Sequence, residues 1–90
     1  MTANRISPVY ASVKSVTKNL TSNNYGNFDL GMTRADGMVI GVYCPNSGWN
    51  CVPFLNSVNW FAYAFKNQTG TTPTFIGNGV TVNSCVIYYV

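Results

Sequence analysis

The last eleven residues of the chain alternate between the two faces of an extended backbone. One face is apolar except for Ser84 and carries Val80, Val82, Val86, Tyr88 and Val90. The other face carries Thr81, Asn83, Cys85, Ile87 and Tyr89. No Gly, Pro or charge interrupts the run, which predicts a strand covered on one face and partly covered on the other. Because an apolar tail in water would be unfavourable, we expect this strand to be held in the domain up to its last residue.

A second alternating stretch is Val58–Lys66. Phe61, Tyr63 and Phe65 fall on one face, and Trp60 falls on the other with small residues. A helix over 59–66 is conceivable, but the density of aromatic residues and the lack of capping residues favour a strand.

Two apolar runs flank the middle of the chain. Met38–Cys44 is almost continuously apolar, which predicts a strand in the centre of a sheet. Cys51–Leu55 predicts a short strand, and Pro53 within it places that strand at an edge or a bulge because proline cannot donate a ladder hydrogen bond.

Near the N-terminus, Val9–Lys18 alternates only in part and predicts an outer strand with a bulge near residues 14–15. Its two lysines, Lys14 and Lys18, would guard an exposed edge. Asp36-Gly37 is the clearest turn in the chain, and Asn67–Thr74 is expected to be a loop.

About six strands, joined by turns rich in Asn, Gly and Pro, predict an all-β fold. We expect a small antiparallel β-sandwich or jelly-roll-like domain over residues 9–90, preceded by a flexible leading segment over residues 1–8.

Charge is scarce in this chain. Charged residues make up 8% of it, against about 25% in typical domains, and Asn, Thr and Ser take their place. Such a neutral, hydrated surface suits symmetric association or recognition of uncharged polar ligands such as sugars. It is equally the composition of an outer β-face with no ligand, because these residues tolerate strands and turns.

The net charge of +3 comes from dispersed basic residues that form no phosphate-binding run, so we expect no nucleic-acid partner. No stretch reaches the roughly 18 apolar residues of a membrane helix, so we expect no membrane insertion. Residues 1–8 contain no apolar segment, so no signal peptide is expected.

The three cysteines, Cys44, Cys51 and Cys85, are odd in number and irregularly spaced, which argues against a disulfide scaffold. Cys44 and Cys51 flank a six-residue loop, and a bridge between them is one interpretation. The other is that both are small buried apolar residues. With no histidine and no CxxC pair, we expect no metal and no cofactor.

Catalysis by this chain is not expected. It has no histidine and no glutamate, and Asp29 and Asp36 both lie in turn contexts. A cysteine nucleophile would lack its usual imidazole base.

Binding is the better hypothesis, since an aromatic ring can stack on the apolar face of a sugar while amides bond its hydroxyl groups. Trp49, with Asn46 and Asn50 beside it, is the first candidate, and Tyr25 is a weaker second. Trp49 is equally well interpreted as a lid folded over the core.

Three apolar residues are candidates for a subunit interface. Trp60 lies within a predicted strand, where core and interface are both reasonable places for it, and Tyr88 and Val90 lie in the terminal strand.

The order of several segments resembles the C-terminal head domains of tailed-phage and prophage fibre proteins. The likeness rests on Val16–Thr21, Asp36–Tyr43, Asn59–Phe65 and Val80–Val90, and it spans most of residues 13–90. It lies in the polar opening strand, the apolar strand interrupted by Gly41, and the terminal strand that ends on the last residue.

This resemblance implies a homotrimer that belongs to a virion or prophage-derived particle, is made in the host cytoplasm and recognises a host-surface saccharide. Other virion proteins are further expected partners. Trimer contacts would add burial that a 90-residue core lacks. The alternative is a monomeric carbohydrate-binding module or small lectin that uses Trp49. The chain departs from fibre heads in that only a dozen residues precede its first predicted strand, where a long stalk is usual.

Overall fold

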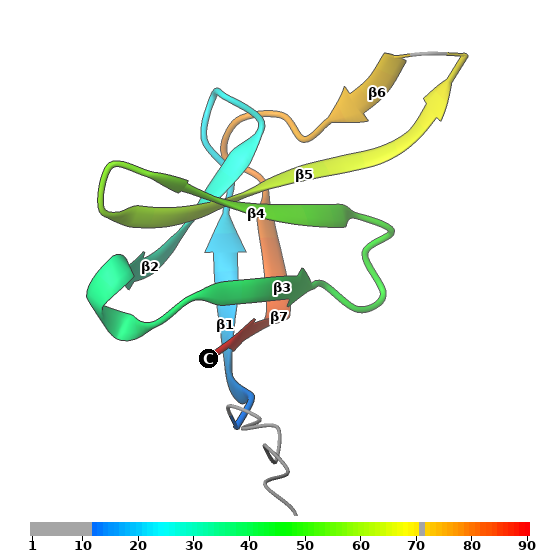
Figure 1. Ribbon diagram of the computed structural model, residues 1–90. Helices are drawn as coiled ribbons and strands as arrows, with labels where there is room; N and C mark the ends of the chain where they lie inside the picture. The colour runs from blue at the N-terminus through cyan, green and yellow to red at the C-terminus, as the bar shows by residue number, and fades with distance from the viewer. Residues whose placement is uncertain (1–11, 71) are drawn as a thin grey trace, which may run out of the picture.

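The computed structural model describes residues 12–70 and 72–90, and within them the chain forms seven strands and one 3-10 helix. The elements are β1 (Lys14–Thr21), β2 (Asn27–Thr33), η1 (Arg34–Asp36), β3 (Val39–Tyr43), β4 (Asn50–Asn56), β5 (Asn59–Thr69), β6 (Thr72–Phe75) and β7 (Thr81–Tyr89). They build two antiparallel sheets, so the predicted all-β class is confirmed (Figure 1). The leading segment, residues 1–8, lies outside the described residues. In the described part of the chain, no helix is long and apolar enough to cross a membrane.

The two sheets pack in a sandwich-like arrangement, with β4 and β5 crossing in front of β1 and β7 (Figure 1). One sheet has the order β1-β7-β3, and the other has the order β2-β5-β4, with β6 also paired to β5. The apolar run Met38–Cys44 was expected in the centre of a sheet, and this is wrong because β3 lies at an edge. The strand β4 of the other sheet packs against it, and Val39 is buried, but Met38, Ile40 and Tyr43 of this apolar run are exposed. The central strand is β7, which pairs with β1 on one side and β3 on the other.

The predicted alternation of the terminal strand breaks at Ser84. This residue has a φ of 59°, and the register between β1 and β7 shifts beside it. The extra residue of such a bulge reverses which side chains face inward. Val82, Cys85 and Ile87 are therefore all buried, although strict alternation would separate the first from the other two. Asn19 stabilises the bulge because its Oδ1 accepts the Ser84 backbone N–H at 3.0 Å.

The bulge expected near residues 14–15 of β1 is thus misplaced, since the irregularity lies between Lys18 and Leu20. The edge position of β1 is confirmed, but its two lysines differ. Lys14 is exposed, with its Nζ 5.9 Å from the centre of the Tyr89 ring. Lys18 instead donates from Nζ to the carbonyl oxygen of Leu30 at 2.8 Å, and so links β1 to β2 of the other sheet.

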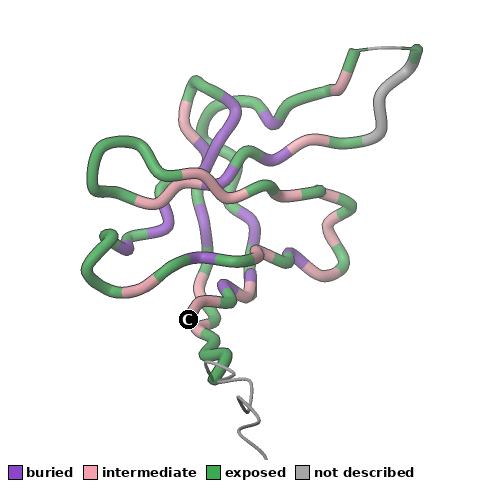
Figure 2. The backbone as a smooth tube through the Cα atoms, viewed as in Figure 1, coloured by how far each residue is buried: buried purple, intermediate pink, exposed green. Residues whose placement is uncertain are grey.

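The core lies where the two sheets cross, and the connecting loops are mostly exposed (Figure 2). Its buried members are Leu20, Phe28, Leu30, Met32, Val39, Cys44, Ala62, Ala64, Ile76, Val82, Cys85 and Ile87. Trp60 packs against this core, and its indole Nε1 donates to the carbonyl oxygen of Gly37 at 3.0 Å. The indole therefore ties β5 to the turn before β3.

The loop expected over Asn67–Thr74 is largely a hairpin. β5 continues to Thr69 and β6 pairs back with it, and the pair extends beyond the two sheets (Figure 1). The polar composition favoured a loop, but threonine is β-branched and suits strands.

A disulfide joins Cys44 to Cys85, and Cys51 keeps a free thiol. The bridge considered between Cys44 and Cys51 is therefore absent from this structure. The cause is the pairing of β3 with β7, which sets Tyr43 opposite Val86 and so brings the next residue, Cys44, opposite Cys85.

The predicted turn at Gly37 is confirmed and generates a stability prediction. Gly37 has a φ of 140°, and a Cβ added there would lie 2.6 Å from the carbonyl oxygen of Val90. That oxygen accepts the backbone N–H of Met38, so Gly37→Ala must displace the end of the chain. We expect the free energy of unfolding, measured by urea denaturation, to fall by about 2 kcal/mol.

Gly77→Ala is the matched control, because Gly77 has no positive φ and no atom lies within 4 Å of the added Cβ. Its effect should stay within about 0.5 kcal/mol. Equal losses in the two variants would contradict this account of Gly37.

Candidate functional site

The outer face of the second sheet carries a row of aromatic side chains. Along β5, Ala62 and Ala64 point into the core, so Phe61, Tyr63 and Phe65 point to the opposite face. This confirms the two faces predicted for Val58–Lys66. The β4 register sets Phe54 opposite Phe61, which extends the row across two strands.

The rings of this row stack on one another. Phe54 and Tyr63 have centroids 4.4 Å apart, and Phe54 and Phe61 have centroids 5.6 Å apart. In each pair the two ring planes are inclined by 20°, which makes Phe54 nearly parallel to each of its neighbours. Phe75 of β6 meets Tyr63 edge-on at 5.9 Å. Offset and edge-on contacts of this kind are the favoured arrangements of aromatic pairs, and they hold the rings in place.

The loop between β1 and β2 forms the rim beside these rings. Asn23 Nδ2 donates to Asn27 Oδ1, and Asn23 Oδ1 accepts the backbone N–H of Tyr25 at 2.9 Å. The Asn23 backbone N–H also donates to the Asn27 carbonyl oxygen at 2.9 Å. These bonds close a tight turn in which Gly26 has a φ of 76°. Tyr25 stands at its tip with 76% of its surface exposed.

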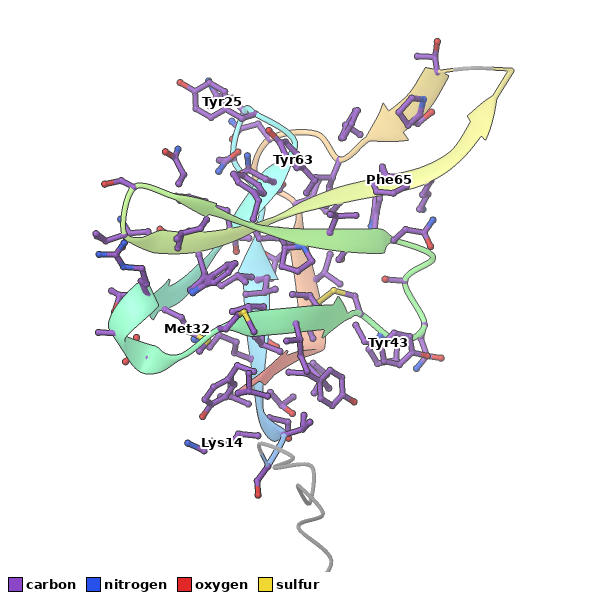
Figure 3. All side chains as sticks on the ribbon, in the orientation of Figure 1. Lys14, Tyr25, Met32, Tyr43, Tyr63 and Phe65 are labelled. Carbon is purple, nitrogen blue, oxygen red and sulfur yellow. A yellow bond between two sulfur atoms is a disulfide. The ribbon has the colours of Figure 1, made fainter. Side chains whose placement is uncertain are left out.

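Rings and rim together enclose a hollow of about 400 Å³, which we call the amide–aromatic pocket. It is lined by four rings and three amides, namely Tyr25, Phe54, Phe61, Tyr63, Asn23, Asn27 and Asn56. Figure 3 shows Tyr25 and Tyr63 toward the same end of the molecule, with Tyr43 far from both. No described lysine, arginine or carboxylate is among the lining residues.

Trp49 lies at a different hollow, of about 450 Å³, between the loop that follows β3 and the start of β7. Asn46 also lines this hollow, but Asn50 does not, because it begins β4 and pairs with Phe65. The indole ring packs against the core, and the Nζ of Lys66 lies 4.5 Å from its centre. Trp49 is therefore both a lid on the core and a wall of this hollow, rather than an exposed loop tip.

The sequence candidates are thus divided between two places. Trp49 and Asn46 share one hollow, whereas Tyr25 belongs to the amide–aromatic pocket. The sequence interpretation did not select Phe54, Phe61, Tyr63 or the amides as ligand-binding residues. The alternation of Phe61 and Tyr63 was visible, but only the strand register shows that Phe54 and the loop at residues 23–27 meet them.

The three interface candidates also occupy different environments. Trp60 packs inside, as described above, while Tyr88 lies on the outer face of the first sheet with 38% of its surface exposed. Val90 is half-buried, and its backbone exchanges two hydrogen bonds of 2.9 Å with Met38. The last residue is therefore held in place, as the terminal strand pattern predicted.

Both aspartates accept hydrogen bonds from backbone N–H groups close to them in the sequence, but Asp29 lies in β2 rather than in the turn that was expected, and Asp36 ends the 3-10 helix η1. Asp29 Oδ1 accepts the Gly31 backbone N–H at 2.9 Å, and Asp36 Oδ2 accepts the Thr33 backbone N–H at 2.8 Å. Over residues 12–70 and 72–90, no group of three or more His, Cys, Asp or Glu side chains is arranged to hold a metal ion.

The construction of the rim can be tested by comparing Asn27→Ala with Tyr25→Ala. Asn27 is buried and hydrogen-bonded to Asn23, so its loss should lower the free energy of unfolding by about 1–2 kcal/mol. Tyr25 is exposed, so its loss should change the stability by less than about 0.5 kcal/mol. Thermal or urea denaturation measures both losses. A larger loss for Tyr25→Ala than for Asn27→Ala would contradict the role of Asn27 in holding the rim together.

Comparison of the chain with protein-family models, with curated proteins and with solved structures finds no match.

Proposed function

We propose that this protein is a non-enzymatic binding module that recognises an uncharged saccharide in the amide–aromatic pocket. The observation that carries the proposal is the stack of Phe54, Phe61 and Tyr63 bordered by three asparagine amides. The ligand is named by its chemistry, because a pyranose ring has an apolar face of C–H groups and an edge of hydroxyl groups.

Each part of the pocket suits one part of such a ligand. The aromatic rings that line the pocket offer an apolar wall against which the C–H face can pack. An asparagine amide both donates and accepts, so it can pair with hydroxyl groups in either role. Apolar walls with a few fixed polar groups are typical of small-molecule sites. The internal bonds of the rim also hold Asn23 and Asn27 in place before a ligand arrives, which lowers the entropy lost on binding.

The lining favours a neutral ligand over a charged one. An acidic saccharide or a single-stranded nucleic acid would need cations beside the rings. Among the described lining residues there is none, and Asp29 lies on the same face, where it pairs with Phe61 across β2 and β5. A carboxylate at this place would repel phosphate or sulfate groups.

The setting we propose is a viral or prophage-derived particle, with this chain as a jelly-roll-like fibre-head or decoration domain that forms a homotrimer. The resemblance to fibre heads motivates it, and so do the large apolar side chains exposed on the first sheet and its edge, among them Met38, Ile40 and Tyr88. Exposed apolar groups gathered in one region are typical of protein interfaces.

Saccharide recognition is tested with Tyr25→Ala and its matched control Tyr43→Ala. Both side chains are exposed, but only Tyr25 lines the pocket. A glycan array identifies the strongest neutral ligand, and calorimetry then measures its affinity for each variant. We expect Tyr25→Ala to weaken binding by about tenfold, since an aromatic contact contributes roughly 1–1.5 kcal/mol, and Tyr43→Ala to leave it unchanged.

A protein that binds no glycan on the array would contradict the proposal, as would equal affinities of the two tyrosine variants. Trp49→Ala distinguishes the two hollows. If it removes binding while Tyr25→Ala does not, the ligand occupies the hollow beside Trp49, as the monomeric-lectin alternative holds.

The proposed trimer is tested by size-exclusion chromatography with multi-angle light scattering. We expect a solution mass three times the 9.8 kDa of the chain. A single-chain mass at micromolar concentration would contradict the trimer and leave the saccharide proposal standing.

A further inference from the structure

All three cysteines of the chain meet at one place between the two sheets. Cys44 follows β3, Cys85 belongs to β7, and Cys51 belongs to β4. Cys44 and Cys85 are buried and disulfide-bonded, and the bridge is the yellow bond near the end of β3 (Figure 3). The sulfur of Cys51 lies 3.7 Å from the sulfur of Cys44, about the distance of van der Waals contact. A free thiol therefore touches one sulfur of an existing disulfide.

We propose that these three residues form an internal thiol–disulfide exchange site, in which Cys44 changes its partner between Cys85 and Cys51. During folding, the thiolate of Cys85 attacks the sulfur of Cys44, and a Cys44–Cys85 bond forms as the Cys44–Cys51 bond breaks. The electron pair leaves on the sulfur of Cys51, which then takes up a proton. In the folded chain, the reverse step starts from the thiolate of Cys51. Each side of the reaction holds one disulfide and one thiol, so no oxidant or reductant is consumed.

The two pairings close loops of very different length, and this gives the exchange a role in folding. Cys44 and Cys85 are 41 positions apart, whereas Cys44 and Cys51 are 7 apart. In an unfolded chain the probability of closure falls as the three-halves power of loop length, so the short loop closes about 14 times more often. The unfolded chain therefore favours Cys44–Cys51, and the pairing of β3 with β7 reverses this preference. Exchange at the site therefore moves the disulfide of Cys44 from Cys51 to Cys85.

Burial slows the reverse exchange once the Cys44–Cys85 bridge has formed. It raises the pKa of the Cys51 thiol from 9.0 to about 11, so at pH 7 about one molecule in ten thousand carries the attacking thiolate. The strands packed against β4 are β3 and β5, and their described ionisable groups are Tyr43, Tyr63 and Lys66. Tyr43 is exposed, Tyr63 faces outward, and the Nζ of Lys66 lies over Trp49, so burial alone shifts this thiol.

The exchange is tested by following the bridge during refolding of the full chain. Trypsin cuts after Arg34 and Lys66, and no Lys or Arg lies between them, so Cys44 and Cys51 share the peptide 35–66 while Cys85 lies in 67–90. After the thiols are blocked in acid, a Cys44–Cys85 bridge links the two peptides, whereas a Cys44–Cys51 bridge leaves them separate. Tandem mass spectrometry distinguishes Cys44–Cys85 from a Cys51–Cys85 bridge.

We expect the chain oxidised in denaturant to carry Cys44–Cys51 over Cys44–Cys85 by about 14 to 1. On removal of denaturant and oxidant, it should convert to more than about nine-tenths Cys44–Cys85, at a rate independent of protein concentration. Cys51→Ser is the control, because it can close only the long loop. Three results would overturn the proposal: a Cys44–Cys51 bridge that persists in the folded chain, a conversion rate that scales with protein concentration, or an oxidised denatured chain that already pairs Cys44 with Cys85.

The effect of burial on the Cys51 thiol can be measured in the native protein from the pH dependence of its alkylation rate. Alkylation of its thiol by iodoacetamide should accelerate about tenfold for each pH unit from 7 to 10. In the urea-unfolded chain the rise should level off near pH 9, the ordinary pKa of the thiol. A plateau near pH 9 in both states would contradict the protection of the finished bridge.

Discussion

The central strand β7 is hydrogen-bonded along both edges, to β1 and to β3, and the other features of the first sheet follow from this double pairing. It joins the last residues of the chain to segments about 45 and 70 positions earlier, so the sheet cannot form until the whole chain is present. The bulge at Ser84 then turns Val82 and Cys85 to the same side. Without that local irregularity, the strand would bury one or the other.

The second sheet depends on the alternation of small and aromatic side chains along β5. Ala62 and Ala64 are small, which lets the two sheets approach closely on the inner face, while the bulky rings of Phe61 and Tyr63 are placed on the outer face. Aromatic residues exposed on a sheet are unfavourable unless they cover one another or a ligand. Here Phe54 covers both rings, and an open hollow remains beside them. The same alternation therefore supplies the core and the candidate site.

The sulfur atoms and the core are connected in a similar way. Cys44 and Cys85 are buried members of the core at the point where β3, β4 and β7 meet, and the disulfide fixes the end of the edge strand β3 to the centre of its sheet. Cys51 comes close because β4 follows β3 after a short loop and crosses to the other sheet. A chain with an odd number of cysteines thus brings a disulfide and a free thiol into contact.

Properties that depend on neighbouring residues could be predicted from the sequence. The period of two along Val58–Lys66 showed which rings share a face, Pro53 indicated an edge strand, and Asp36-Gly37 indicated a turn. Each of these follows from the backbone geometry of a few consecutive residues. The all-β class followed from their sum.

Properties that depend on distant pairing were decided only by the tertiary structure. The sequence did not show that Cys44 faces Cys85, that Lys18 reaches the carbonyl oxygen of Leu30, or that β3 lies at an edge. It selected Tyr25 but not the rings of Phe54 and Tyr63 beside it. Register and sheet order place residues up to 75 positions apart (Lys14 and Tyr89) against each other, and a single bulge changes the register of every residue beyond it. The alternation of side chains along a strand is the same whichever strand pairs with it, so it indicates neither the sheet order nor the register.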